Sequence, residues 1–198
     1  AVALTVFLLI PLRQRDLRAA LGVMWLWLAL QISVLLLLTW FAPTQLERAF
    51  EDGFLYRADE LALSLLEQGI TGMKIWPFDP YAEASGGLYI SNPDLDRALE
   101  PFRKIRSAVG NQMDIMVEFH SLWNLPTAKK IARALEEFEP FWYEDPIKAD
   151  NIDALADFAA CTFVPATVSE TLATRWSFPE VILAKAAGVV MPALSWCG

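Results

Sequence analysis

The chain has 198 residues, of which 55% are hydrophobic and 20% are charged, and its formal net charge is −8. This length is enough for one ordinary domain but falls short of a complete (β/α)₈ barrel, which needs about 250 residues. The acidic balance argues against nucleic acid as a partner, because the phosphate backbone would repel such a surface.

The first fifty residues differ in composition from the remainder. They carry four arginines against Asp16 and Glu47, a net charge of +2, so that residues 51–198 carry −10. Residues 19–42 contain no charged side chain. As a helix they would extend about 36 Å, enough to cross a hydrocarbon core of about 30 Å. We therefore predict two regions, a hydrophobic segment at 1–50 and a globular domain at 51–198.

Three interpretations of the hydrophobic segment stay open. It spans a membrane through residues 19–42 with its arginine-flanked end on the cytoplasmic side, it packs as a buried helix, or it is a non-native join. The acidic remainder is typical of a cytoplasmic protein, so we predict that location, with a membrane-anchored protein as the alternative. Cys161 and Cys197 match no metal or redox spacing and are predicted to be buried thiols.

From residue 54 onward, helical and strand-like patterns alternate along the chain. The predicted helices cover residues 56–68, 94–109, 126–138, 151–160 and 178–186. The predicted strands cover residues 71–76, 113–119, 141–143, 164–169 and 189–195. Residues 79–92 are predicted to form a long solvated loop near the mouth of the site.

This alternation predicts an α/β fold with parallel strands. Each strand is a short apolar run, as expected when helices cover both faces of a sheet. About five strand–helix units are visible. An open doubly wound sheet and a partial TIM-like (β/α) barrel fit the periodicity equally well.

Three glutamates fall at equivalent places in successive units. Glu118, Glu144 and Glu170 end three successive predicted strands at a regular spacing of 26 residues. In a barrel, the carboxyl ends of the strands converge on one face, where active sites lie. Carboxylates brought together repel one another unless a cation neutralises them, and Mg²⁺ suits three carboxylates plus water and substrate. The pattern predicts a Mg²⁺ site, the alternative being side chains that point into loops or pair with nearby cations.

A lysine precedes these glutamates at the corresponding place. Lys74 ends the strand before Glu118 and is expected to point into the same mouth. There it would bind a substrate carboxylate or lower the energy of an enolate. The alternative is an ordinary surface lysine.

Several segments resemble the mandelate racemase/muconate-lactonizing enzyme group of the enolase superfamily. They read GITGMKIWPFD, MVEFHSLWNLPTAKKIARAL, FWYEDPI, SETLATR and GVVMPALSWCG, within residues 54–198. The resemblance implies part of a modified (β/α)₇β barrel that abstracts a proton next to a carboxylate while Mg²⁺ stabilises the enolate. It implies that Glu118, Glu144 and Glu170 are the metal ligands. Lys74 matches the first lysine of the family's Lys-x-Lys strand motif.

The sequence also departs from the family pattern. Trp76 stands in place of the second lysine of the motif, and Ala193 stands where the family offers an aspartate that orients a catalytic histidine. His120 is the single histidine of the chain and follows the first ligand by two residues, where related dehydratases often carry a catalytic or substrate-binding group. No acidic partner for it is evident in the sequence. Residues 1–50 do not resemble the family's capping domain, and the last barrel strands are expected to be missing.

We therefore predict a Mg²⁺-dependent lyase or isomerase with Lys74 and His120 as catalytic residues. Its substrate would be a small hydroxy-carboxylate, and the broken Lys-x-Lys pair favours dehydration of a sugar acid over racemisation. The alternative is a catalytically inactive, truncated or membrane-tethered chain that at most binds a divalent metal. An incomplete barrel would expose strand edges and apolar helix faces, so a homo-oligomer is also predicted.

Overall fold

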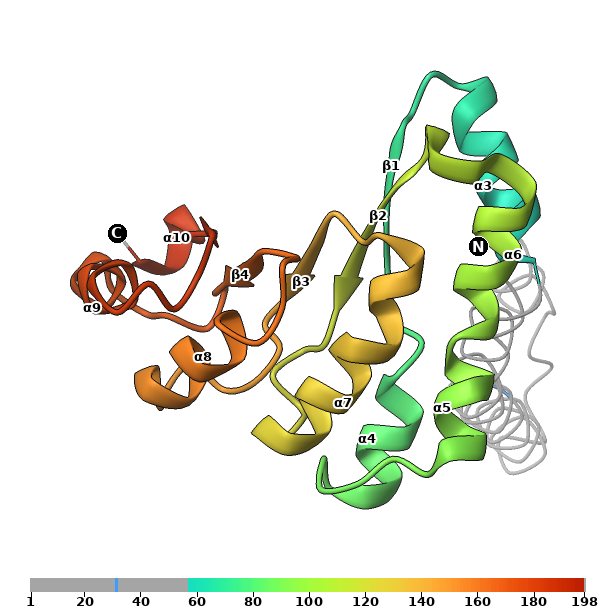
Figure 1. The fold of residues 1–198 in the computed structure, drawn as a ribbon. Helices are drawn as coiled ribbons and strands as arrows, with labels where there is room; N and C mark the ends of the chain where they lie inside the picture. Colours follow the sequence, from blue (N-terminus) through green and yellow to red (C-terminus); the bar gives the residue numbers. More distant parts are fainter. Residues whose placement is uncertain (1–30, 32–56, 198) are drawn as a thin grey trace, which may run out of the picture. The chain divides into compact units, whose positions relative to one another are not determined.

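The computed structural model describes Gln31 and residues 57–197 of the chain (Figure 1). Gln31 apart, these residues belong to one of the two units into which the chain divides between Phe50 and Glu51. The predicted hydrophobic segment at 19–42 lies outside the described residues except for Gln31, which is helical and exposed. Within the described part, no helix is long and apolar enough to cross a membrane.

A five-stranded parallel sheet organises the described part. Its strands are β1 (Gly72–Ile75), β2 (Asp114–Glu118), β3 (Trp142–Glu144), β4 (Ala166–Val168) and β5 (Val189–Val190). They pair in the order β1-β2-β3-β4-β5, each with the next strand along the chain. A doubly wound sheet reverses its strand order at a switch point, and this sheet does not. The prediction of a partial barrel is therefore confirmed, and the doubly wound alternative is wrong.

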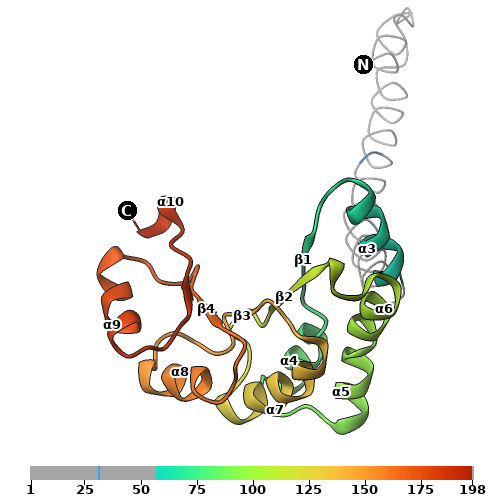
Figure 2. The ribbon, with the colours of Figure 1, turned by 45° about the horizontal axis from the view of Figure 1, so that its top comes forward.

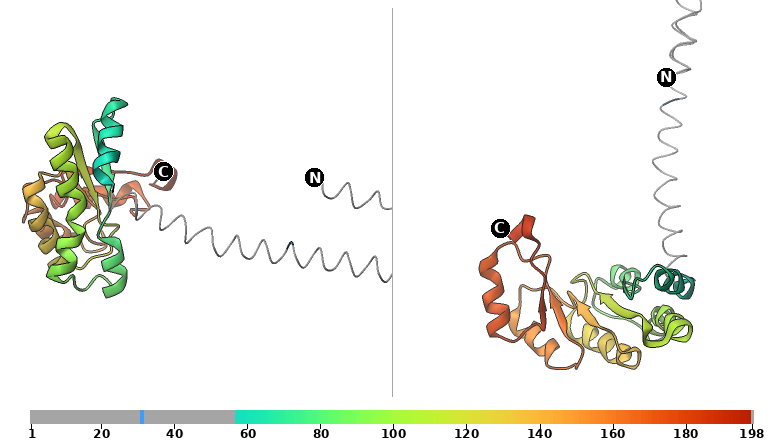
Figure 3. Two further views of the ribbon diagram at one scale, coloured as in Figure 1. Left: turned by 90° about the vertical axis from the view of Figure 1, so that its right-hand side faces the viewer. Right: turned by 90° about the horizontal axis from the view of Figure 1, so that it is seen from above.

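Helices connect the strands. They are α3 (Ala58–Glu67), α4 (Asp79–Ser85), α5 (Asn92–Ala98), α6 (Glu100–Val109), α7 (Leu125–Leu135), α8 (Ile152–Ala159), α9 (Phe178–Leu183) and α10 (Leu194–Cys197). Short 3₁₀ turns add η2 (Gly110–Gln112), η3 (Glu136–Phe138) and η4 (Arg175–Ser177). α3 packs against α6, α7 against α8, and α8 against α9. Figures 2 and 3 show α7, α8 and α9 along the outer side of a curved sheet.

A cluster of aromatic side chains fills the space between the sheet and the helices. Phe78, Phe102 and Phe119 are fully buried, and the rings of Phe102 and Phe119 each stack on Phe78 with centroids about 6 Å apart. Phe119 also contacts the rings of Tyr143 and Phe158 edge-on. The phenol of Tyr143 is satisfied, because it donates a hydrogen bond to the Ala132 carbonyl at 2.9 Å. This core anchors the ends of β2 and β3.

The structure corrects several predicted boundaries. The helix predicted at 94–109 is two helices that meet at Leu99, because Pro101 lacks an N–H and its ring obstructs a continuous helix. The strand predicted at 189–195 pairs only over Val189–Val190, Pro192 cannot continue the ladder, and residues 194–197 are helical. Cys161 is a free thiol as predicted, but it is exposed rather than buried.

The segment predicted as a loop at 79–92 contains α4. Pro80 stands in the first turn of this helix, where its fixed φ is favourable, and Gly86 ends it in the left-handed conformation. The prediction of a solvated loop is therefore wrong for residues 79–85. This short helix brings residues that follow β1 to the end of β2.

Candidate functional site

Two of the predicted metal ligands lie side by side at the carboxyl ends of their strands. Glu118 is the last residue of β2 and Glu144 the last residue of β3, and the two are register partners in the parallel ladder. The two residues are 3% and 4% exposed. Adjacent parallel strands point paired residues to the same face, so the sheet itself places the two carboxylates together.

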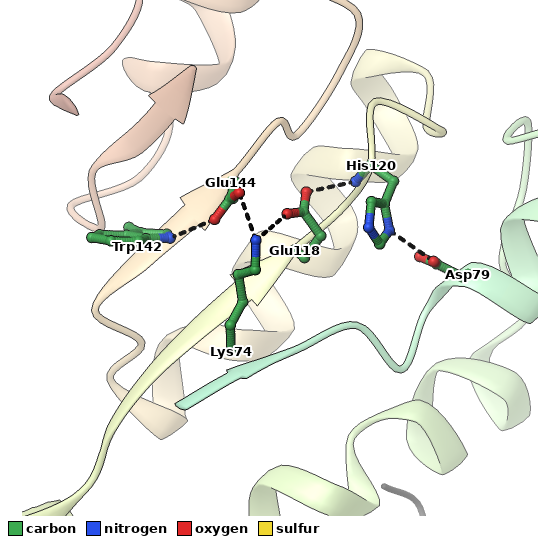
Figure 4. Close-up of polar contacts among 6 residues, drawn as sticks. All are labelled: Lys74, Asp79, Glu118, His120, Trp142 and Glu144. Atoms are coloured by element: carbon green, nitrogen blue, oxygen red, sulfur yellow. Dashed lines mark hydrogen bonds and ion pairs between the residues drawn. The ribbon is translucent and has the colours of Figure 1, made fainter. Parts of the chain in front are cut away.

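Lys74 from β1 completes this cluster. Its Nζ lies 2.9 Å from Glu118 Oε2 and 2.7 Å from Glu144 Oε1, as Figure 4 shows. The lysine side chain is 39% exposed, whereas the carboxylates are buried. Lys74 thus points towards the glutamates, the orientation that a role at the mouth of the site requires.

The remaining carboxylate oxygens are also engaged. The backbone N–H of His120 donates to Glu118 Oε1 at 3.0 Å, and the indole N–H of Trp142 donates to Glu144 Oε2 at 3.2 Å. Each carboxylate therefore has both oxygens in hydrogen bonds. Such bonds fix the orientation of a buried charged group and compensate part of its desolvation.

The electrostatics of the cluster are those of two buried carboxylates that share one cation. Burial, with a hydrogen bond to the Glu144 side chain, raises the pKa of Glu118 to about 7 against the opposing effects of Lys74 and the His120 amide. Burial acts in the same direction on Glu144, but hydrogen bonds to Glu118 and Lys74 outweigh it and hold that pKa below its ordinary value. Near neutral pH a proton on the pair therefore favours Glu118. Burial would lower the pKa of Lys74, but its hydrogen bonds to Glu144 and Glu118 raise it.

The third predicted ligand is not in contact with the other two. Glu170 follows the end of β4 by two residues and is exposed. Among residue 31 and residues 57–197, no three acidic, histidine or cysteine side chains are grouped so as to hold a metal ion. The structure therefore brings together Glu118 and Glu144, with Lys74 between them, and leaves Glu170 at the rim.

A further buried carboxylate lies beside Glu144. Asp145 is 2% exposed, and burial raises its pKa to about 6, although a hydrogen bond to the Ser169 side chain acts against this. The charges of Glu144 and Glu170 raise its pKa further. One of its oxygens, Oδ1, is buried and has no hydrogen-bond partner in the described part of the chain. The end of β3 thus concentrates more negative charge than Lys74 alone balances.

His120 has an acidic partner that the sequence did not reveal. Its ring Nδ1 lies 2.8 Å from Oδ2 of Asp79, the first residue of α4 (Figure 4). The ring also contacts Trp76 edge-on, with centroids 6.0 Å apart. The sequence does not point to Asp79, because it lies 41 positions before His120 and because residues 79–92 have the composition of a loop. The usable signal is the Asp79-Pro80 pair a few residues after a strand, which is typical of a helix start.

A cavity of about 440 Å³ adjoins the histidine. Its walls come from the segments that follow β2, β3 and β4, and it is lined by His120, Ser121, Leu122, Lys148, Ala149, Asp150, Thr171 and Leu172. The carboxyl ends of parallel strands are where ligand sites form in barrels. The cavity therefore offers space for a small molecule next to the histidine.

Comparisons with known proteins agree with this fold. Residues 57–198 match the family model described as "Enolase C-terminal domain-like". A solved enolase of the mandelate racemase subgroup from Agrobacterium tumefaciens is 60% identical with a TM-score of 0.70, over 71% of this chain and 39% of that one. A solved enolase protein from the Sargasso Sea environmental genome is 47% identical with a TM-score of 0.68, over 71% of this chain and 38% of that one.

Curated relatives include D-galactonate dehydratases. The D-galactonate dehydratase of Xanthomonas euvesicatoria is 35% identical over 104 residues, which are 52% of this chain and 27% of the relative. That of Ralstonia nicotianae is 32% identical over 112 residues, 57% of this chain and 29% of the relative. The chain thus matches between a quarter and a third of the length of these relatives.

Proposed function

Because the chain belongs to the enolase C-terminal domain-like family, we propose that it carries the carboxylate half of a site for Mg²⁺-dependent dehydration of a sugar acid. The reaction would remove a proton next to a substrate carboxylate and expel a hydroxyl group from the neighbouring carbon. The observation that carries this proposal is the buried pair Glu118 and Glu144, joined by Lys74 at the strand ends next to His120.

The donor chemistry fits a hard divalent cation. Glu118 and Glu144 offer carboxylate oxygens at one place, and Asp145 adds a buried oxygen without a partner in the described residues. Oxygen-only donor sets of this kind select Mg²⁺ over softer metals. We assign Glu118, Glu144 and Glu170 as the ligands, with Glu170 needing to turn inward from the rim. When bound, the ion would supply positive charge for the enolate oxygens.

The chain's own residues would handle the substrate and its proton. The Lys74 ammonium faces the carboxylate cluster, so it would bind the substrate carboxylate when the glutamates hold a metal ion. His120 lines the adjacent cavity and would hold or donate a proton at its ring nitrogen. General acid–base catalysis of this kind contributes about 10²–10⁴ in rate.

A titration of metal into the full chain tests the ligand assignment. We expect saturable one-site binding of Mg²⁺ or Mn²⁺ by calorimetry, loss of that binding in Glu118→Gln/Glu144→Gln, and weaker binding in Glu170→Gln. The control is Glu83→Gln, which removes an exposed carboxylate of α4 and should bind as the unmodified chain does. Binding retained in the double variant would contradict the ligand assignment.

Turnover tests the reaction class. D-galactonate is the first substrate to assay, because the Xanthomonas relative is a D-galactonate dehydratase. We expect Mg²⁺-dependent formation of a 2-keto-3-deoxy acid that Glu144→Gln abolishes, and activity that survives this substitution would refute the metal mechanism.

The alternative is a chain that binds a divalent ion without turnover. The exposed position of Glu170 and the engagement of both glutamates by Lys74 favour it. Saturable metal binding with no product from any sugar acid would support this second candidate.

A further inference from the structure

The contact between Asp79 and His120 joins two separate strand–helix units. Asp79 opens α4, which follows β1, whereas His120 follows β2. The carboxylate Oδ2 lies 2.8 Å from Nδ1 of the ring, a hydrogen-bond distance. The function proposed above uses His120 but assigns no task to Asp79.

Asp79 is held firmly enough to direct the ring. It follows Phe78, which is fully buried against Phe102 and Phe119, and precedes Pro80 in the first turn of α4. Its side chain is 22% exposed, and Oδ1 is buried without a partner among the described residues. Burial raises the pKa of Asp79, and the contact with His120 acts against this rise. A carboxylate enclosed on one side in this way has Oδ2 as its outward acceptor.

The histidine is restrained from three directions. Its backbone has a φ of 51° and its N–H donates to Glu118, which fixes where the side chain begins. The ring meets the edge of Trp76 at 77°. The other charged groups that face it are Glu118, bound through the backbone amide, and Lys148 and Asp150, which line the same cavity from the segment after β3. The carboxylate at hydrogen-bond distance from the ring is that of Asp79.

We propose that Asp79 is a positioning residue that fixes the orientation and tautomer of the His120 ring. A neutral imidazole has one N–H donor and one acceptor nitrogen, and an ionised carboxylate only accepts. The carboxylate therefore places the proton on Nδ1 and leaves Nε2 as the acceptor nitrogen for the cavity. This proposal deepens the proposed function, because Nε2 becomes the atom that exchanges a proton with a substrate.

The tautomer can be observed without any turnover. His120 is the single histidine of the chain, so ¹⁵N spectra of the full, tag-free protein contain one imidazole. With the ring neutral, we expect Nδ1 to show the shift of a protonated nitrogen and Nε2 that of an unprotonated one. In Asp79→Ala the shifts of Nδ1 and Nε2 should move towards each other, as in a mixture of tautomers. Asp79→Glu should restore the original separation. A protonated Nε2 in the unmodified chain would overturn the proposal.

The matched control is Glu83→Ala. It removes another acidic side chain of the same helix, one that is exposed and that only raises the pKa of Asp79 through its charge, so Asp79 stays ionised and the tautomer of the ring should be unchanged. If Glu83→Ala shifts the ring nitrogens as Asp79→Ala does, the effect is a general one of charge or helix stability and the proposal is wrong. Circular dichroism of each variant establishes that the fold is retained.

Kinetics provides the second readout. With D-galactonate and Mg²⁺, Asp79→Ala should lower kcat by about tenfold to a hundredfold with little change in KM, because orientation of an acid–base group acts on the chemical step. Asp79→Glu should recover part of kcat. An unchanged kcat would overturn the catalytic part of the inference while the proposed function stands. If no variant, nor the unmodified chain, turns over a sugar acid, the proposed function fails, and the spectra alone decide the role of Asp79.

Discussion

Two parts of the domain differ in how much of their apolar surface is buried: the part around β1 to β3, and the part that follows β4, with η4 and α9. In the first, Phe102 is fully buried and the charged groups at the strand ends contact one another. In the second, Trp176 is 74% exposed, Leu183 is 83% exposed, and Glu170 lies at the rim. Glu118 and Glu144 are therefore held in one orientation while Glu170 is not, because packing against a core fixes rotamers that solvent leaves free.

The largest loss in the free energy of unfolding should come from a cavity in the core beside β1 to β3. Phe102→Ala removes a ring that packs against both Phe78 and Phe138, with centroids 6.1 and 5.6 Å away. Deleting a buried phenylalanine typically costs about 3–5 kcal/mol. The matched comparison is Trp176→Ala in η4, where the side chain is exposed, and it should change the free energy of unfolding by less than about 0.5 kcal/mol. Denaturant unfolding of both variants measures the contrast, and equal losses would mean that the two parts are packed alike.

An intermediate effect should appear where the two parts meet, at Asp145 and Ser169. Because burial holds the pKa of Asp145 at about 6, the folded chain keeps a proton there that the unfolded chain loses above about pH 4. The free energy of unfolding should therefore fall as pH rises from about 4 to 6, by at most about 3 kcal/mol, and this loss should persist above that window.

Replacing the titrating group isolates this contribution. The Asp145→Asn variant has no carboxyl group at this position. Its free energy of unfolding should therefore fall less as pH rises from about 4 to 6. Glu118 also has a raised pKa, but it is present in both proteins and cancels in the difference. Denaturant unfolding of the two proteins at several pH values measures the difference, and parallel pH profiles would contradict the assignment.

The smallest of these effects on stability should come from Gly87, which closely approaches the segment that follows His120. A Cβ on Gly87 would lie 1.8 Å from the Leu122 carbonyl oxygen, and the Asn124 amide donates to the Gly87 carbonyl at 3.0 Å. Gly86→Ala is the control, since it has a similar positive φ but no atom within 4 Å of its Cβ. Both variants carry left-handed strain of about 1–2 kcal/mol, so the excess for Gly87→Ala, about 1–3 kcal/mol, reports the close approach. Equal melting temperatures of the two variants would show that the backbone at Leu122 can move away from the added Cβ at little cost.

Much of the fold could be predicted because its signals are local. The apolar face of Leu95, Leu99, Phe102 and Ile105 is buried as its periodicity indicates. Glu118 and Glu144 are 26 residues apart, the length of one strand–helix unit, and they pair in register on neighbouring strands. Regular units of similar length place these two equivalent residues at equivalent points of the sheet. Lys74 is not at the equivalent point, because it lies 44 residues before Glu118 and pairs in register with Met116, and it is its side chain that reaches the two carboxylates.

The remainder depends on contacts that periodicity does not encode. α4 is one short helix with a proline at its start and two glycines after it, a composition that also describes a loop. Without that helix, no sequence rule places Asp79 beside His120. Glu170 has the same spacing as the other glutamates, yet β4 ends at Val168 and leaves it two residues beyond the sheet. Spacing fixes a position along the chain, but only packing decides where the side chain lies.

The origin of the site in successive strand–helix units has a consequence for how such a protein can diverge. The carboxylates end β2 and β3, whereas the partner of the histidine belongs to the segment after β1. Substitutions at Asp79 in α4 can therefore change the orientation of the His120 ring without removing a carboxylate of the Glu118–Glu144 pair. Under the proposed roles, the charge of the Glu118–Glu144 pair and the orientation of the His120 ring are thus set by side chains from different segments of the chain.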